Sequence, residues 1–183
     1  MRHLLFRLGL AAAPLLFLPS LVGAQGTGAP AAGSPAPKPC ATPEHRQFDF
    51  WVGDWNVVDP KGEPAGTNDV KSVFGGCVVM ENWVGAGGET GSSFNIYNAP
   101  ARKWHQTWVD SHGQVLLLDG QFREGKMVLE GRREGASGGT VVDRISWERI
   151  NGDPNRVRQL WQASRDGGKT WAVVFEGTYV RKS

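Results

Sequence analysis

His105 is the residue of this chain whose type and position best suit acid–base chemistry in a protein interior. It lies in the alternating run Lys103-Trp104-His105-Gln106-Thr107-Trp108-Val109, where adjacent side chains of a strand point to opposite faces. Trp104 and Trp108 therefore share one face, and His105 lies on the other. A histidine facing an enclosed pocket beside a carboxylate could act as a general acid–base group. One hypothesis is accordingly a cavity enzyme, isomerase- or hydrolase-like, that uses His105 with a carboxylate.

Carboxylates on other strand-like segments supply possible partners, but their spacing selects no acid–base pair. Those that could line an interior are Asp110, Asp119, Glu130 and Asp143. No Gly-x-Ser-x-Gly sequence accompanies them, and the glycine-rich segment 85–91 lacks the lysine of a phosphate-binding loop. Neither cysteine has a neighbouring His or Cys, so no metal site is predicted. Segment 85–91 is predicted to be a mobile loop.

The run Ser164-Arg165-Asp166-Gly167-Gly168-Lys169-Thr170-Trp171 matches the Asp-box pattern S-x-D-x-G-x-T-W. In this pattern the Asp caps its own turn and the Trp packs beneath the hairpin. A single copy predicts a stable hairpin and carries no evidence of glycosidase activity.

Aromatic residues are more numerous than a small core requires, since the chain has eight Trp, eight Phe and two Tyr. The surplus is predicted to line a site for an apolar ligand. The residues predicted to face this site are Trp83, Phe94, Trp104, Trp108, Leu117 and Trp147. His105 joins them as a polar anchor only if its strand has the opposite register, because Trp104 and His105 cannot both face inward. A fully filled core is the alternative.

The elements that must position these residues are short strands separated by turn sequences such as Asp59-Pro60-Lys61-Gly62 and Asn151-Gly152-Asp153-Pro154. The predicted strands span 54–58, 68–74, 77–84, 92–97, 103–109, 114–122, 126–132, 141–149, 156–164 and 171–179. About ten strands with no intervening helix predict an all-β antiparallel meander. A closed barrel leaves no exposed edges and is the preferred architecture, with a β-sandwich as the second possibility.

One short helix is predicted before the first strand. Thr42-Pro43-Glu44 provides a cap residue and a proline at the first helical position, and the helix should end near Gly53. It leads into Trp55 on the first strand, where a large side chain can fill the tapered end of a small barrel. Trp51, Gly53 and Trp55 are therefore predicted to form a plug at one end.

The N-terminus has the features of a secretory signal. Arg2 and Arg7 precede an apolar run that ends in the small residues Val22-Gly23-Ala24, which predicts a signal peptide over 1–24. Prolines interrupt the apolar run, so stable membrane insertion is not predicted. Segment 25–39 is an Ala/Pro/Gly leader predicted to be disordered, and 40–183 is predicted to form a single domain. The protein should be periplasmic or secreted.

Charge and cysteine content agree with export. The chain has 20 Lys and Arg against 18 Asp and Glu, and loss of Arg2 and Arg7 with the signal makes these numbers equal. The strongest basic pair, Arg132-Arg133, is flanked by acidic residues, so a nucleic-acid partner is not predicted. Cys40 and Cys77 are the two cysteines, and an even count in an exported protein predicts a disulfide between them.

The segment Phe48-Asp49-Phe50-Trp51-Val52-Gly53-Asp54-Trp55 resembles the start of calycin barrels, the group of lipocalins, fatty-acid-binding proteins and nitrobindin-like barrels, whose first strand carries Gly-x-Trp. Segments 75–78, 95–98, 103–110 and 171–181 are further similar to a bacterial secreted family of unknown function. The resemblance covers nearly all of 40–183. It implies an exported lipocalin-like domain and supplies no catalytic residues.

The resemblance and the aromatic surplus together predict an exported β-barrel that binds a small apolar or amphipathic molecule in its lumen. Nitrobindin-like barrels hold haem through a His near the chain end, and the last predicted strand, 171–179, contains none. We therefore predict no cofactor. Two alternatives remain: the cavity enzyme that uses His105, and a cell-envelope interaction scaffold with a filled core.

Overall fold

The computed structural model describes residues 38–183. The alternating sequence and frequent turns of this part of the chain produce an almost entirely β structure. The predicted signal peptide and the leader up to residue 37 lie outside the described residues. The strands are β1 (Gly53–Val58), β2 (Pro64–Val73), β3 (Val78–Gly85), β4 (Thr90–Asn98), β5 (Lys103–Asp110), β6 (Val115–Arg123), β7 (Lys126–Glu134), β8 (Thr140–Arg149), β9 (Arg156–Ser164) and β10 (Ala172–Arg181).

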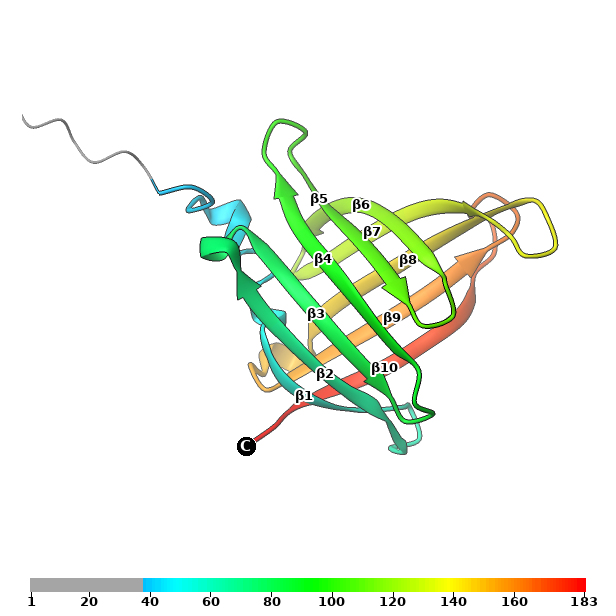
Figure 1. Ribbon diagram of the computed structural model, residues 1–183, viewed down its shortest axis with the longest axis horizontal. Helices are drawn as coiled ribbons and strands as arrows, with labels where there is room; N and C mark the ends of the chain where they lie inside the picture. Colours follow the sequence, from blue (N-terminus) through cyan, green and yellow to red (C-terminus); the bar gives the residue numbers. More distant parts are fainter. Residues whose placement is uncertain (1–37) are drawn as a thin grey trace, which may run out of the picture. The chain divides into compact units, whose positions relative to one another are not determined.

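Each strand pairs antiparallel with the next, and β1 also pairs with β10, which closes the sheet into a ten-stranded barrel (Figure 1). In the closing pair Trp55 lies opposite Arg181. The predicted closed antiparallel barrel is therefore confirmed, and the β-sandwich alternative is wrong. A single continuous sheet cannot have the two separate sheets of a sandwich, and closure removes both unpaired edges.

The strand boundaries follow the turn sequences closely. The main difference is β2, which begins at Pro64 rather than at residue 68. The reason is a tight turn in which Asp59 Oδ1 accepts hydrogen bonds from the backbone N–H groups of Lys61 and Glu63, at 2.8 and 2.9 Å. This turn brings Pro64 opposite Val58, where the ladder contains a bulge.

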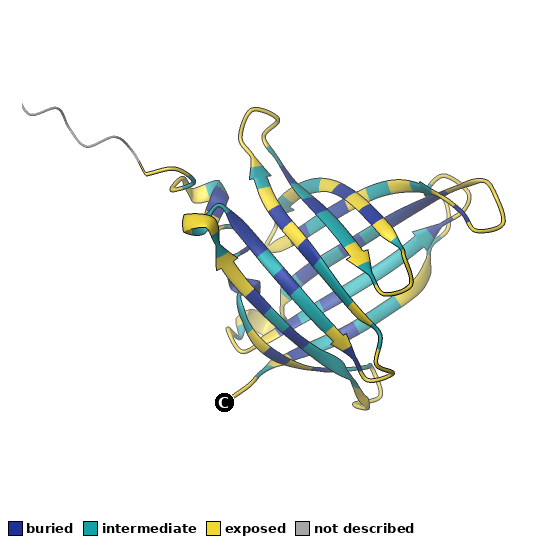
Figure 2. Ribbon diagram, in the orientation of Figure 1, coloured by how far each residue is buried: buried dark blue, intermediate teal, exposed yellow. Residues whose placement is uncertain are grey.

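Burial alternates along the strands, with buried and exposed bands visible in Figure 2. On β8, for example, Ile145 and Trp147 are buried at 4% and 1% exposure, whereas Arg144 is only partly buried. The inward side chains of all ten strands thus form one core, as the period of two requires.

The predicted N-terminal helix is present as two single-turn 3-10 helices, η1 (Pro43–Arg46) and η2 (Asp49–Trp51). Two further turns of this kind, η3 (Phe74–Gly76) and η4 (Ile150–Gly152), connect strands. None of the helices within 38–183 is long and apolar enough to cross a membrane.

Aromatic side chains from η2 and β1 close one end of the barrel. Phe48, Trp51 and Trp55 have no exposed surface, and Phe48 stacks on Trp51 with ring centroids 5.0 Å apart. Trp55 Nε1 donates to the carbonyl of Trp51 at 2.9 Å. The Arg181 guanidinium covers the Trp55 ring at 4.3 Å and donates to the Val52 carbonyl at 3.2 Å. This end is therefore sealed by packing and by hydrogen bonds together.

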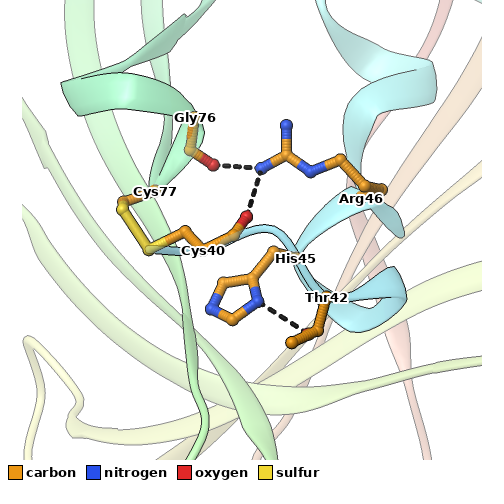
Figure 3. Close-up of a disulfide and its surroundings, with 6 residues drawn as sticks. All are labelled: Cys40, Thr42, His45, Arg46, Gly76 and Cys77. Carbon is orange, nitrogen blue, oxygen red and sulfur yellow. Dashed lines mark hydrogen bonds between the residues drawn. A yellow bond between two sulfur atoms is a disulfide. The ribbon is translucent and has the colours of Figure 1, made fainter. Parts of the chain in front are cut away.

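The Cys40–Cys77 disulfide is confirmed, with a Cα–Cα distance of 5.0 Å. It joins the segment before η1 to the turn between β2 and β3 (Figure 3). Arg46 reinforces the junction by donating to the carbonyls of Gly76 and Cys40. The plug is thus attached to the barrel by a covalent bond as well as by contacts of its own aromatic residues.

The Asp-box sequence forms the hairpin between β9 and β10, as predicted. Asp166 Oδ1 accepts hydrogen bonds from the backbone N–H groups of Lys169 and Thr170, both at 2.9 Å. Trp171 Nε1 donates to the Gly168 carbonyl at 3.0 Å, and the Arg144 guanidinium lies 3.9 Å from the Trp171 ring centroid. The motif therefore stabilises a turn.

Candidate ligand-binding site in the barrel interior

A cavity of about 250 Å³ occupies the half of the barrel that lies away from the plug. The plug shares its end with the β2–β3, β4–β5, β6–β7 and β8–β9 connections, so the hairpins that follow β1, β3, β5, β7 and β9 lie at the opposite end. Glu89 and Thr90 from the β3–β4 hairpin line the cavity, as does Asp110 at the end of β5. The cavity therefore opens where segment 85–91 lies.

Aromatic rings form the walls of this cavity. Its aromatic lining residues are Trp83, Trp108, Trp147, Trp161, Phe175 and Tyr179. The Trp83 and Phe175 rings meet edge to face at 5.7 Å. Two glycines let the rings lie flat against the sheet, because a Cβ on Gly66 would be 2.7 Å from the Trp83 ring and one on Gly91 would be 2.3 Å from the Trp108 ring. Aliphatic contacts come from Ala65, Leu116, Ile145 and Val174.

The inner end of the cavity is polar. Glu81, Gln106, Gln159 and Tyr179 line it, and they belong to a chain of hydrogen bonds that crosses six different strands. The chain runs Gln106 to Asn95, Asn95 to Ser93, Ser93 to Glu81, Asn68 to Glu81, Asn68 to Tyr179 and Tyr179 to Gln159. A buried network of this kind fixes the positions of its members.

Glu81 is the central group of the network, with 4% of its surface exposed. Its carboxyl oxygens accept hydrogen bonds from Asn68 Nδ2 at 2.6 Å and from Ser93 Oγ at 2.7 Å. Burial raises the pKa of Glu81 from 4.5 to about 7, against the opposing effect of these two hydrogen bonds. Burial, and then the nearby Glu81 charge, raise the pKa of Tyr179 well above its usual value. Tyr179 therefore stays protonated at neutral pH, whereas Glu81 titrates.

The position of Glu81 predicts a pH-dependent stability. Below pH 4.5 Glu81 is protonated in the folded and unfolded chains, and between pH 4.5 and about 7 only the unfolded chain releases the proton. The free energy of unfolding should therefore fall across this window, by about 3 kcal/mol in total, and stay low above it. Glu81→Gln should remove this fall and raise the free energy of unfolding at pH 8 by about 3 kcal/mol, as measured by urea denaturation between pH 4 and 8.

Glu130→Gln is the matched control for this measurement. Glu130 lies on the outer face of β7, where it pairs with Arg144, and 46% of its side chain is exposed. Glu130→Gln removes the same charge as Glu81→Gln. The fall in the free energy of unfolding between pH 4.5 and 7 should nevertheless remain. Equal pH profiles for the native protein and Glu81→Gln would mean that Glu81 does not carry the effect.

Of the residues predicted to bind a ligand, Trp83, Trp108 and Trp147 line the cavity. Trp104 faces inward, but it belongs to the closed end, where it packs edge to face on Phe48 at 5.6 Å and donates to Gln47 Oε1 at 3.2 Å. The predicted inward orientation of Phe94 and Leu117 is wrong, since they are 47% and 57% exposed. Their strands have the opposite register: the polar Ser93 and Asn95 and the leucines 116 and 118 take the inward positions.

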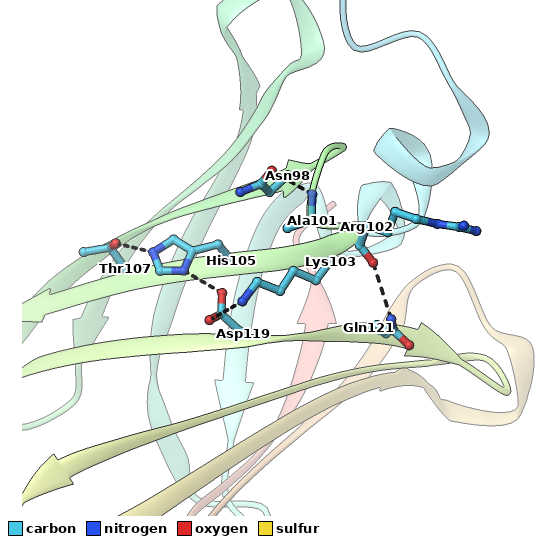
Figure 4. Close-up of polar contacts among 8 residues, drawn as sticks. All are labelled: Asn98, Ala101, Arg102, Lys103, His105, Thr107, Asp119 and Gln121. Atoms are coloured by element: carbon cyan, nitrogen blue, oxygen red, sulfur yellow. Dashed lines mark hydrogen bonds and ion pairs between the residues drawn. The ribbon is translucent and has the colours of Figure 1, made fainter.

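His105 lies on the outer face of β5, as simple strand alternation predicts. Its Nδ1 is 3.0 Å from Asp119 Oδ1 and its Nε2 is 3.0 Å from Thr107 Oγ1, while Lys103 Nζ pairs with Asp119 at 2.9 Å (Figure 4). The histidine is therefore a member of a surface network across β5 and β6. It does not reach the cavity, so the pairing of His105 with a lumen carboxylate is not formed.

The four carboxylates considered from sequence have different positions. Asp119 and Glu130 face outward in ion pairs, and Asp110 lies at the cavity mouth. Asp143 is fully buried, where Arg133 Nε donates to it at 2.7 Å and Trp161 Nε1 donates to it at 2.8 Å. Its charge is thus already compensated.

Sequence reasoning missed Glu81, although a signal for it exists. Val79, Glu81 and Trp83 alternate along one strand, so an inward Trp83 requires an inward Glu81. Gln106 could have been found in the same way, because it lies between Trp104 and Trp108 on their face of β5. Gln159 has the same relation to Trp161 on β9, whereas Ser93 and Asn95 carry no such signal.

No family model and no curated protein matches the chain.

Proposed function

We propose that this protein binds a small amphipathic molecule in the lumen of its barrel. The observation that carries the proposal is the cavity of about 250 Å³, which has aromatic walls and a polar inner end. Concave, largely apolar sites with a few positioned polar groups are the usual form of a small-molecule site. Glu81, Gln106 and Gln159 would orient the polar end of the ligand, and Trp83, Trp108 and Trp161 would surround its apolar part.

Two buried polar atoms beside the polar end of the cavity are unpaired. Trp147 Nε1 and Asn68 Oδ1 have no hydrogen-bond partner among the described residues. Trp147 lines the cavity, and Asn68 is bonded to Glu81 beside it. An unpaired buried polar group costs stability, so the polar end of the cavity is held in place at some energetic cost.

The other proposed functions are less well supported. The cavity enzyme requires His105 next to a carboxylate in the lumen, and His105 lies outside the barrel with Asp119. The scaffold requires a filled core, whereas about 250 Å³ of the interior is open to a ligand. Binding is therefore the function we favour.

We also propose that the domain is an exported, lipocalin-like calycin barrel. Support comes from Gly53-Asp54-Trp55 at the start of β1, the plug that precedes it and the closed ten-stranded meander. The Cys40–Cys77 disulfide is of the kind that persists in oxidising compartments outside the cytosol. The predicted signal peptide would direct the protein there.

The neutral fluorescent probe N-phenyl-1-naphthylamine tests the binding function. Binding should increase its emission and change the tryptophan fluorescence of the protein. Trp108→Ala should weaken binding by about 1–3 kcal/mol, because it removes one large side chain from the cavity wall. The measurement is a fluorescence titration at fixed pH with the folded state checked by circular dichroism.

Phe94→Ala is the matched control, since Phe94 is an aromatic residue of the outer face. It should leave probe affinity unchanged. Absence of any probe signal from the native protein, or equal effects of the two variants, would show that the cavity is not a ligand site.

A further inference from the structure

The inner end of the cavity holds a carboxyl group that has no cationic partner. Glu81 accepts hydrogen bonds from the neutral groups of Asn68 and Ser93, at 2.6 and 2.7 Å. None of the ion pairs within residues 38–183 includes it. A buried carboxylate is normally paired with a cation or made neutral. When ionised, the Glu81 carboxylate therefore has a negative charge that no cation of the described residues compensates, and a cationic ligand could neutralise it.

The remaining charges around the cavity have the same sign. Its charged lining residues are Glu81 at the inner end and Glu89 and Asp110 at the mouth, and no Lys, Arg or His lines it. Arg133, on β7, is engaged with the buried Asp143 and is not part of the lining. A low-dielectric cleft with charges of one sign concentrates ligands of the opposite sign.

The walls suit a particular kind of cation. Trp83, Trp108 and Trp161 present ring systems on three sides of the lumen, from β3, β5 and β9. Aromatic walls pack against the apolar body of an organic amine, and they exclude the water that a small inorganic ion would bring. A divalent metal would need several oxygen ligands at short distances, and Glu81 is the one carboxylate at the inner end.

We propose that the cavity binds an organic amine in its cationic form, with the ammonium group at Glu81 and the apolar body between the tryptophans. This inference rests on the proposed ligand-binding function and names the ligand class. Anions are excluded by the three lining carboxylates, and a neutral ligand leaves Glu81 without a countercharge.

The amine should bind with a characteristic dependence on pH. Because burial raises the pKa of Glu81 to about 7, the free carboxyl is partly protonated at neutral pH. The other titratable groups that face the cavity are Tyr179, which stays protonated, and Glu89 and Asp110 at the mouth. A cation binds better to the ionised carboxylate, so its affinity should rise as pH increases from 5.5 to 8, and the pKa of Glu81 should fall in the complex.

Three probes of similar shape test the inference: 2-phenylethylamine, 2-phenylethanol and phenylacetate, titrated calorimetrically and by displacement of N-phenyl-1-naphthylamine. At pH 8 the amine should bind at least about tenfold more tightly than the alcohol, and phenylacetate most weakly. The advantage of the amine over the alcohol should shrink toward pH 5.5. In Glu81→Gln the ratio of the two affinities should approach one, and in Glu130→Gln, on the outer face, it should keep its native value.

The outcomes separate the two proposals. Equal binding of amine and alcohol, a preference for phenylacetate, or an amine preference that survives in Glu81→Gln overturns the amine inference while lumen binding stands. Failure of all three probes together with the neutral fluorescent probe overturns the binding function itself, and the amine inference with it.

Discussion

Trp55→Ala is expected to lower the free energy of unfolding by about 3–5 kcal/mol, the range for truncation of a fully buried large aromatic residue. Trp55 has no exposed surface, contacts Tyr179 at a centroid distance of 6.2 Å and donates a hydrogen bond to the Trp51 carbonyl. The substitution leaves a cavity at the closed end and an unpaired Trp51 carbonyl. It also removes the ring on which the Arg181 guanidinium packs. Urea denaturation followed by far-ultraviolet circular dichroism measures the loss.

The comparison with an exposed aromatic residue makes this test specific. Phe94→Ala, on the outer face of β4, should change the free energy of unfolding by less than about 1 kcal/mol. If Trp55→Ala cost no more than Phe94→Ala, the first strand would not supply the plug. Circular dichroism is the preferred signal because removal of a tryptophan changes fluorescence directly.

The double substitution Cys40→Ser and Cys77→Ser is expected to cost about 3–4 kcal/mol of stability, the chain-entropy value for a loop of this size. The sequence separation of 37 residues means that the bond restricts a large part of the unfolded chain. The effect should appear as a lower urea midpoint at nearly unchanged native circular dichroism, because the contacts of Phe48 and Trp51 remain.

Reduction provides the second arm of this experiment. The native protein under dithiothreitol should unfold at the same urea concentration as the double serine variant, and intact mass should show two hydrogens gained on reduction. A native protein with two free thiols, or a double variant of unchanged stability, would contradict the role assigned to the bond.

The fold could be predicted from sequence because its signals are local. Each turn contains Gly, Pro, Asn or Asp at the required place, and the segments between them alternate over much of their length, so ten strands and their order follow. Trp51 and Trp55 could be assigned to the plug from an equally local signal, the aromatic segment that leads through Gly53 into the first strand. The β2 start was missed because it depends on Asp59 side-chain hydrogen bonds rather than on alternation.

The site was predicted only where hydrophobicity and inward orientation coincide. Trp83, Trp108 and Trp147 satisfy both. Phe94 and Leu117 are apolar but face solvent, since Ser93, Asn95 and the flanking leucines occupy the inner positions. Hydrophobicity alone therefore failed on β4, whose inner face is polar, and on β6, where leucines lie on both faces. Glu81 was overlooked because a lone glutamate is usually exposed, and its surroundings are contributed by strands that are distant in sequence.

Closure of the barrel through β1 and β10 determines when the cavity forms during folding. The seam joins the first strand to the last, and Tyr179 on β10 contacts Asn68 and Gln159 at the inner end of the cavity. Pairings between such distant segments form late and slowly. A chain that lacks its final strand thus has two open edges, and its cavity lacks the wall formed by Val174, Phe175 and Tyr179. Ligand-binding capacity should accordingly emerge in a single step, when the C-terminus docks.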